Sequence, residues 1–158
     1  MKEQIEGTIG VSLKKYNLID DIIKQANGAY LAYSTLKLNL LNIAISNGAL
    51  ACELYLKALL YSKINKKINT HSLIELVNLL YDYNKKAFIF IQNSFINNAI
   101  NDFPKCIEQI SNWFIEFRYP YEYEKYIAVR INILEIFLIT LKRYCNEHYI
   151  ERIDIYEQ

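Results

Sequence analysis

Glycine and proline are scarce in this chain, with four and two copies among 158 residues. Few residues therefore interrupt regular structure, and the apolar residues recur at helical spacing instead of alternating as they do in strands. This pattern argues against a sheet protein. The length and the 53% hydrophobic content suit one domain with a sizeable core. We predict an all-α fold, an up-and-down bundle of four to five helices.

Neither sign of charge prevails in the sequence. Eighteen Lys and Arg residues face seventeen Asp and Glu residues, for a formal net charge of +1. The chain thus lacks a broad basic field, and any contact with RNA has to come from a local patch. The first residues lack the apolar run of a signal peptide, and no stretch of eighteen apolar residues is free of charged or clustered polar groups. We expect a cytoplasmic protein with no membrane partner.

Cysteine and histidine are rare as well. The three cysteines are Cys52, Cys106 and Cys145, and they lie far apart without a C-x-x-C pair. The two histidines, His71 and His148, have no carboxylate at helical spacing between them. We therefore predict no metal site and no cofactor, and we interpret the cysteines as core thiols in a reducing compartment.

Apolar periodicity predicts helices along most of the chain. The predicted helices cover 18 to the high thirties, 40–62, 71–80, 83–102, 104–118 and 124–147. Thr70 is the predicted cap of the third, and Pro104 suits the first turn of the fifth. Residues 1–15 are predicted to be a loose arm, 16–150 the helical domain and 151–158 a tail.

Two of the predicted helices have a distinctive pattern. The only charged residues within 40–62 are Glu53 and Lys57, so we expect this helix to lie at the centre of the bundle. The final helix has a broad apolar face that is wide enough, by residue count, for both a core and a dimer contact. We expect a homodimer whose interface the sequence does not assign to one helix face, and this face is a candidate, with Phe137 and Leu138 as its contacts.

Glu53 borders an apolar stripe, and a buried carboxylate there requires a partner. Arg118, at the end of an apolar helix, is the natural candidate because a guanidinium matches a carboxylate through two bonds. A local pair with Lys57 at i,i+4 spacing is the alternative. In a third interpretation, Arg118 faces a groove and holds a phosphate with help from Lys57 or from a lysine of the segment 62–70.

His71 begins a predicted helix, where it either packs and caps or takes part in proton transfer. The segment after Arg118 is rich in tyrosine. Its candidate binding residues are Tyr119, Tyr121 and Glu122, and Tyr123 is a further catalytic candidate. Tyrosine rings beside a cation can stack on nucleic-acid bases, and they can equally pack the bundle.

Three segments together resemble the HEPN superfamily of small helical domains. They are the Glu-x-x-x-Lys-x-Leu-Leu helix at 53–60, the helix start at His71-Ser72-Leu73, and the aromatic-rich helix that ends at Arg118. The resemblance implies a bundle of four or five helices, frequent homodimerisation, and a role in toxin–antitoxin modules, phage defence or RNA processing. It implies RNA, an antitoxin or a nucleotidyltransferase as partners.

Many proteins of that superfamily are metal-independent endoribonucleases with an arginine followed, after four to six residues, by a histidine. Arg118 matches the arginine, but Tyr123, Glu124 and Lys125 occupy the three positions allowed for the histidine. A tyrosine that titrates near about 10 transfers protons poorly at neutral pH.

We therefore interpret the chain as a non-catalytic or divergent HEPN-like module that acts through protein or nucleic-acid binding. The alternative is a metal-independent endoribonuclease. In it, Arg118 would stabilise the reacting phosphate, and His71, Glu53 or Tyr123 would replace the missing histidine.

Overall fold

The computed structural model describes residues 18–117 and 129–156, with side chains described as far as His148. These residues form six helices and no strand, so the all-α prediction is confirmed, with more helices than the four to five expected. The helices are α1 (Leu18–Leu36), α2 (Leu41–Ile64), α3 (Leu73–Tyr83), α4 (Lys85–Asn97), α5 (Phe103–Glu116) and α6 (Ile131–Tyr156).

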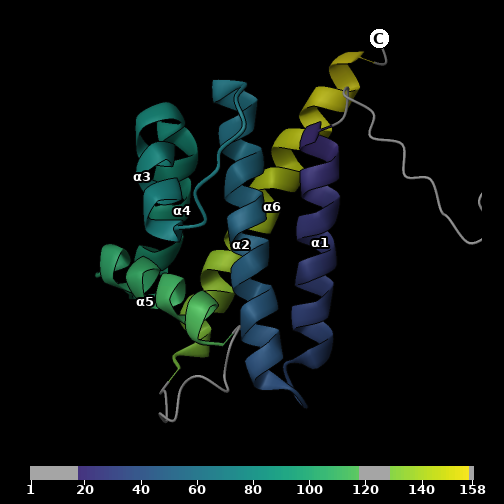
Figure 1. The fold of residues 1–158 in the computed structure, drawn as a ribbon. Helices are drawn as coiled ribbons and strands as arrows, with labels where there is room; N and C mark the ends of the chain where they lie inside the picture. The colour runs from purple at the N-terminus through teal and green to yellow at the C-terminus, as the bar shows by residue number, and fades with distance from the viewer. Residues whose placement is uncertain (1–17, 118–128, 157–158) are drawn as a thin grey trace, which may run out of the picture.

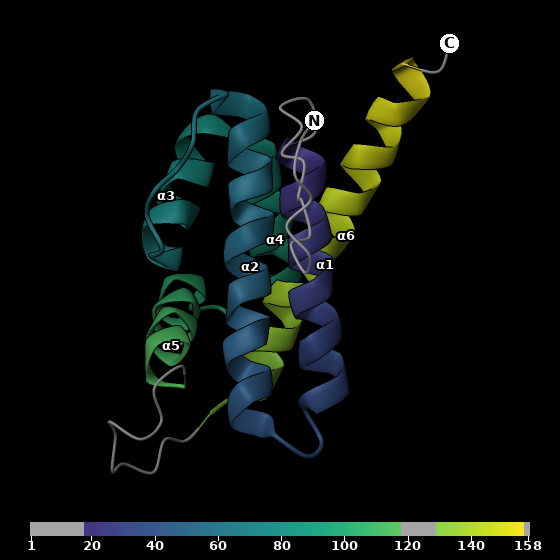
Figure 2. The ribbon, with the colours of Figure 1, turned by 45° about the vertical axis from the view of Figure 1, so that its right-hand side comes forward.

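Helix α2 is the centre of the bundle, as predicted. It contacts α1, α3, α5 and α6. Figure 1 shows α1 on one side of α2, α3 and α5 on the other, and α6 crossing behind it, and Figure 2 shows the same order after a 45° turn. Because α2 is covered on three sides, an apolar residue is stable at nearly every position along it.

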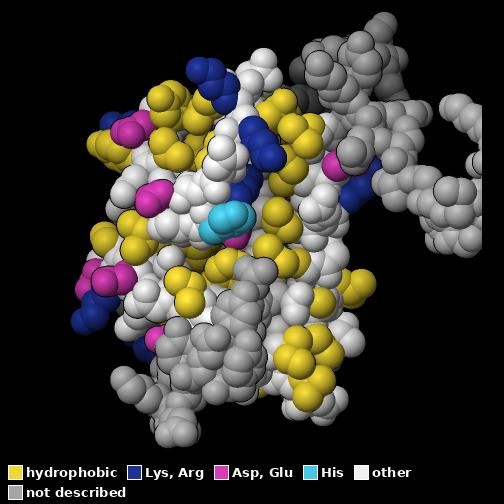
Figure 3. Space-filling model, in the orientation of Figure 1, with side chains coloured by type: hydrophobic (Ala, Val, Ile, Leu, Met, Phe, Trp, Pro, Cys, Tyr) yellow, Lys and Arg dark blue, Asp and Glu magenta, His cyan; other side chains and the backbone are white. Residues whose placement is uncertain are grey.

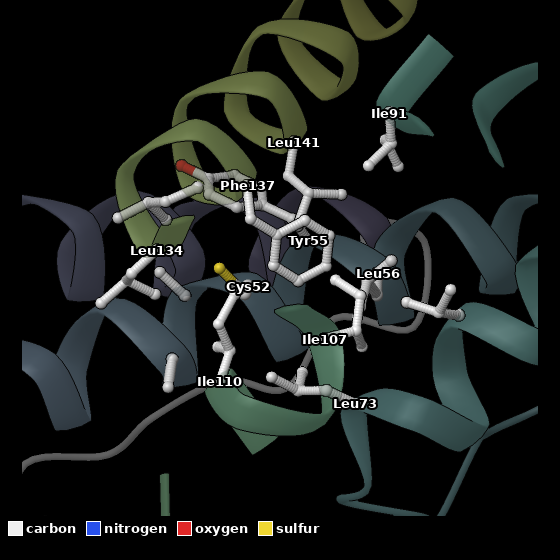
Figure 4. Packing of buried hydrophobic residues seen from close by; sticks show 14 of the residues in the cluster. Cys52, Tyr55, Leu56, Leu73, Ile91, Ile107, Ile110, Leu134, Phe137 and Leu141 are labelled. Carbon is white, nitrogen blue, oxygen red and sulfur yellow. The ribbon is translucent and has the colours of Figure 1, made fainter. Parts of the chain in front are cut away.

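The core forms where side chains of five helices meet around the middle of α2. Figure 4 shows Cys52, Tyr55 and Leu56 of α2 at the centre of this cluster. The residues around them are Leu73 of α3, Ile91 of α4, Ile107 and Ile110 of α5, and Leu134, Phe137 and Leu141 of α6.

Gly48 lets α2 approach two neighbouring helices closely. A Cβ atom at this position would lie 3.0 Å from Cδ2 of Tyr33 in α1 and 3.1 Å from Cδ2 of Leu134 in α6. Gly28 of α1 has no such role, since a Cβ there would meet nothing within 4 Å. Helix α1 continues through Asn27 and Gly28, and Asn27 Oδ1 accepts a hydrogen bond from the hydroxyl of Tyr55 in α2.

The start of α3 differs from the prediction. The helix begins at Leu73, and Ser72 is its N-cap, with a side chain that accepts a bond of 3.3 Å from the backbone N–H of Glu75. Thr70 is not the cap, because its hydroxyl donates to the Glu75 carboxylate and accepts from the Ser72 N–H. His71 therefore lies before the helix and does not cap it.

Helix α6 also differs from the prediction in length. Residues 129 and 130 are not helical, so the helix begins at Ile131 instead of near Glu124. It continues to Tyr156, through six of the eight residues predicted as a tail. No glycine or proline follows Cys145, and the helix thus meets no residue that stops it.

The candidate dimer contacts on α6 lie inside the protomer. Phe137 and Leu138 have no exposed surface within the single chain, and Thr140 is buried as well. The face is broad because α6 packs against both α2 and α4. A lysine at Phe137 or Leu138 would disrupt the core of one protomer and would report nothing about a dimer.

Candidate functional site

Three polar residues meet where α2 passes the connection between α2 and α3. Glu53 lies in the middle of α2 and is only 2% exposed. Its Oε1 accepts a hydrogen bond of 2.7 Å from Nζ of Lys57, one turn further along the helix. The same oxygen lies 2.8 Å from Nδ1 of His71. Glu53, Lys57 and His71 are called the polar triad below.

The triad is layered from the core to the surface. The carboxylate of Glu53 lies at the bottom, the side chain of Lys57 is 15% exposed, and that of His71 is 74% exposed. The carboxylate is therefore shielded by its own two partners. A molecule that approaches from solvent meets the imidazole and the ammonium group before it meets the carboxylate.

The contact with Glu53 also orients the imidazole ring. An ionised carboxylate can only accept, so it favours the tautomer in which Nδ1 carries the proton. The other ring nitrogen, Nε2, is then an acceptor in the neutral ring and a donor in the protonated one, on a side chain that is 74% exposed. The triad thus presents one oriented ring nitrogen and one ammonium group.

The second carboxylate oxygen of Glu53 is less well satisfied. Oε2 is buried and makes no hydrogen bond in the part of the chain that the structure describes. A buried acceptor without a partner costs about 1–3 kcal/mol, so its position has to be held by the contacts of Oε1 and by the surrounding packing. Strained arrangements of this kind concentrate at functional sites.

A basic segment borders the triad. The connection between α2 and α3 contains Lys66 and Lys67, both exposed, and Lys63 in the last turn of α2 is exposed as well. Figure 3 shows a histidine at the centre of the face that α2 and α3 form, with basic side chains above it and an acidic group at its edge. Three exposed lysines thus lie on the segment of chain that leads from α2 to His71.

The second histidine is not part of this site. The ring of His148 stacks on Tyr144 of the same helix with 3.9 Å between ring centroids, and its Nδ1 lies 3.0 Å from the Tyr144 carbonyl oxygen. Across residues 18–117 and 129–156, no group of His, Cys, Asp and Glu could hold a metal ion. All three cysteines are buried, as expected for core thiols.

The structure brings together some of the predicted site residues and leaves others untested. The local pair of Glu53 and Lys57 is present, and His71 joins it. Arg118, Tyr119, Tyr121, Glu122 and Tyr123 lie outside the described residues, so the pair of Glu53 with Arg118 stays a prediction. Sequence reasoning missed the contact of Glu53 with His71, because a separation of 18 positions across a loop leaves no periodic signal.

The fold and the triad define a small helical protein with a polar site built on a buried carboxylate of its central helix. The HEPN domain family matches residues 19–147, which is most of the chain. The protein therefore belongs to the HEPN family. No curated protein and no solved structure matches the chain.

Proposed function

We propose that this HEPN protein is a non-catalytic or divergent module that binds RNA, within a bacterial toxin–antitoxin, stress or phage-defence system in the cytoplasm. The observation that carries the proposal is the buried carboxylate of Glu53, which orients Lys57 and His71 toward solvent while it stays inaccessible itself. An RNA phosphate at the triad would meet the Lys57 ammonium group, and the His71 ring as a donor in its protonated form, before it met the buried carboxylate of Glu53.

The chemistry of the two donors supports a phosphate ligand. The ammonium of Lys57 has three donors, of which Glu53 accepts one. The His71 ring adds an N–H donor when it is protonated. The exposed Lys66 and Lys67 in the connection between α2 and α3 add positive charge that can contact further phosphates of the same RNA strand. Electrostatic contacts of this kind supply much of the affinity for single-stranded RNA.

Salt-dependent RNA binding tests this proposal. Fluorescence anisotropy with a labelled single-stranded RNA is measured for the wild type, Lys57→Met and His71→Gln over a range of salt concentrations. His71→Gln changes a side chain that is 74% exposed, whereas Lys57→Met removes a partner of the buried Glu53 carboxylate, so circular dichroism first checks that each variant is folded. The slope of log K against log salt is negative, and each lost phosphate contact should make it less steep by about 0.7.

The matched control is Lys24→Met, which removes an equally large basic side chain from the exposed face of α1. It should leave both affinity and slope unchanged. Binding that is equally weak in the wild type and in the triad variants would refute the proposal, and the search would turn to an antitoxin or a nucleotidyltransferase as partner.

A second candidate function is a metal-independent endoribonuclease, favoured by the contact of Glu53 with His71. A carboxylate that fixes the tautomer of an imidazole is the usual arrangement around a general base. In this reading, His71 moves the proton in place of the missing motif histidine, Arg118 stabilises the phosphate, and Tyr123 remains a further candidate.

Cleavage assays in EDTA distinguish the two functions. Cleavage by the wild type that is lost in both His71→Gln and Arg118→Ala, with circular dichroism unchanged, would support the ribonuclease. Absence of cleavage by the wild type, alongside RNA binding that depends on Lys57, would reject the ribonuclease and leave the binding module.

A further inference from the structure

The connection between α2 and α3 carries His71 to the polar triad without regular structure of its own. Residues 65–72 are not helical, and in Figure 1 they run back along α2 from its end to the start of α3. Among the described residues, no hydrogen bond between two backbone groups involves residues 66–71. The position of His71 against Glu53 therefore has to come from other contacts.

Packing contributes little to the position of the His71 side chain. The side chain is 74% exposed, and its Nδ1 lies 2.8 Å from Oε1 of Glu53. A side chain with so much free surface can turn among its rotamers, and keeping it in one of them costs entropy. The ring stays on the carboxylate only if the backbone of residue 71 is fixed in place and direction.

Thr70 fixes that backbone through the two hydrogen bonds of its single hydroxyl group. Oγ1 accepts a bond of 3.2 Å from the backbone N–H of Ser72, which closes a turn with His71 as its central residue. The hydroxyl also donates to Oε2 of Glu75, in the first turn of α3. The residues on both sides of His71 are thus tied to the start of α3.

The cap of α3 does not require Thr70. Ser72 and Glu75 have the spacing of a capping box, in which the Glu75 carboxylate would accept directly from the Ser72 backbone N–H. One half of the box is regular, since the Ser72 hydroxyl accepts from the Glu75 N–H at 3.3 Å. The other half runs through Thr70, whose hydroxyl lies between that N–H and the carboxylate. The insertion of Thr70 adds a constraint on residue 71 that capping alone does not need.

We propose that Thr70 is a positioning residue that holds the imidazole of His71 on Glu53. The turn that its hydroxyl closes sets the direction in which the ring leaves the backbone, and Glu53 then favours the tautomer with the proton on Nδ1. The consequence for RNA rests on the proposed function. The placement of the ring does not, because it can be measured without any ligand.

NMR of the ring nitrogens tests the placement at about pH 8, where imidazole is normally neutral. The wild type should carry the His71 proton on Nδ1. Thr70→Val keeps the shape of the side chain without its hydroxyl, and His71 should shift to the mixture of both tautomers that a free ring has. Thr70→Ser keeps the hydroxyl and should retain the Nδ1–H form.

Ser72→Ala is the matched control, because it removes the capping hydroxyl and keeps the backbone N–H that donates to Thr70. It should lower the stability of the protein and leave the His71 tautomer unchanged. His148 is an internal reference. Its Nδ1 lies 3.0 Å from the Tyr144 carbonyl oxygen, which can only accept, so its tautomer should be the same in every variant.

Binding of the labelled RNA measures the consequence for the site. Thr70→Val should weaken binding by about the same factor as His71→Gln. The double variant should bind no more weakly than His71→Gln alone, because Thr70 acts through the ring and the two losses are then not additive.

The proposal is overturned if Thr70→Val keeps the Nδ1–H form of His71, or if Ser72→Ala loses that form to the same extent. Additive losses of RNA binding in the double variant would also overturn it. If the wild type binds no RNA, the proposed function fails by itself, and the NMR comparison still decides whether Thr70 positions the ring.

Discussion

Gly48→Ala adds one methyl group at the point where α2 lies closest to α1 and α6. The new Cβ would lie 3.0 Å and 3.1 Å from carbon atoms of Tyr33 and Leu134. Neither neighbour can move away easily. The Tyr33 hydroxyl donates a bond of 2.8 Å to Glu135, which fixes the far end of the ring, and Leu134 has no exposed surface.

Two effects of opposite sign determine the size of the change. An added methyl group in a well-packed core costs about 1–3 kcal/mol. Replacing glycine by alanine inside a helix gains about 0.8–1.0 kcal/mol. The free energy of unfolding of Gly48→Ala should therefore fall by up to about 2 kcal/mol.

Gly28→Ala is the matched control, because it makes the same change inside α1 where nothing lies within 4 Å. This variant should gain only the higher helix propensity of alanine, and its free energy of unfolding should rise by about 0.5–1 kcal/mol. The propensity gain is the same in both variants, so the difference between their free energies of unfolding measures the clash of the added methyl group with Tyr33 and Leu134, about 1–3 kcal/mol. Urea unfolding followed by circular dichroism measures both values. Equal stability of the two variants would refute the close approach at Gly48.

Two further measurements test the electrostatics and the packing. The Tyr33 hydroxyl and then Lys37 hold the pKa of Glu135 below its ordinary value of 4.5 against the opposing effect of burial. The ionised Glu135 contributes its full stabilisation above pH 4.5, and this contribution is lost as the pH falls through the lower pKa of the folded state. The difference in unfolding free energy between the wild type and Glu135→Gln should therefore shrink in that acidic range. A difference that did not depend on pH would contradict the interaction of Glu135 with Tyr33 and Lys37. Burial raises the pKa of the Cys145 thiol to about 12 and also raises those of Cys52 and Cys106. Ellman's reagent should label none of the three in native protein at about pH 8 and all of them in urea, and rapid native labelling would show that a thiol is accessible.

The central helix could be predicted from sequence because a single property decided it. Between Lys37 and Lys63, only Glu53 and Lys57 are charged, and a helix with so few charges has to be enclosed. The start of α3 was harder, since Thr70, His71 and Ser72 precede it and two of them can cap. Ser72 is the cap because the Thr70 hydroxyl is engaged by the Glu75 carboxylate and by the Ser72 N–H. Capping propensities of single residues do not contain such contacts.

The candidate site was predicted in its members and not in its arrangement. Glu53, Lys57 and His71 each stood out, but only the i,i+4 pair follows from helical spacing. The contact of His71 with Glu53 depends on the path of the connection between α2 and α3. The breadth of the α6 face was equally ambiguous, because periodicity reports that residues such as Phe137 share a face and does not report which element covers it.

The placement of Glu53 also affects what α2 does before the rest of the bundle surrounds it. By length and composition this 24-residue helix could cross a lipid bilayer, although 67% of its most apolar window is buried inside the folded protein. Glu53 lies at the middle of the helix, where a charged residue opposes insertion by about 2.5–3.5 kcal/mol. Lys57 adds a second charge one turn away. The two charges therefore oppose the insertion of α2 into a bilayer and favour its enclosure by the other helices of the bundle.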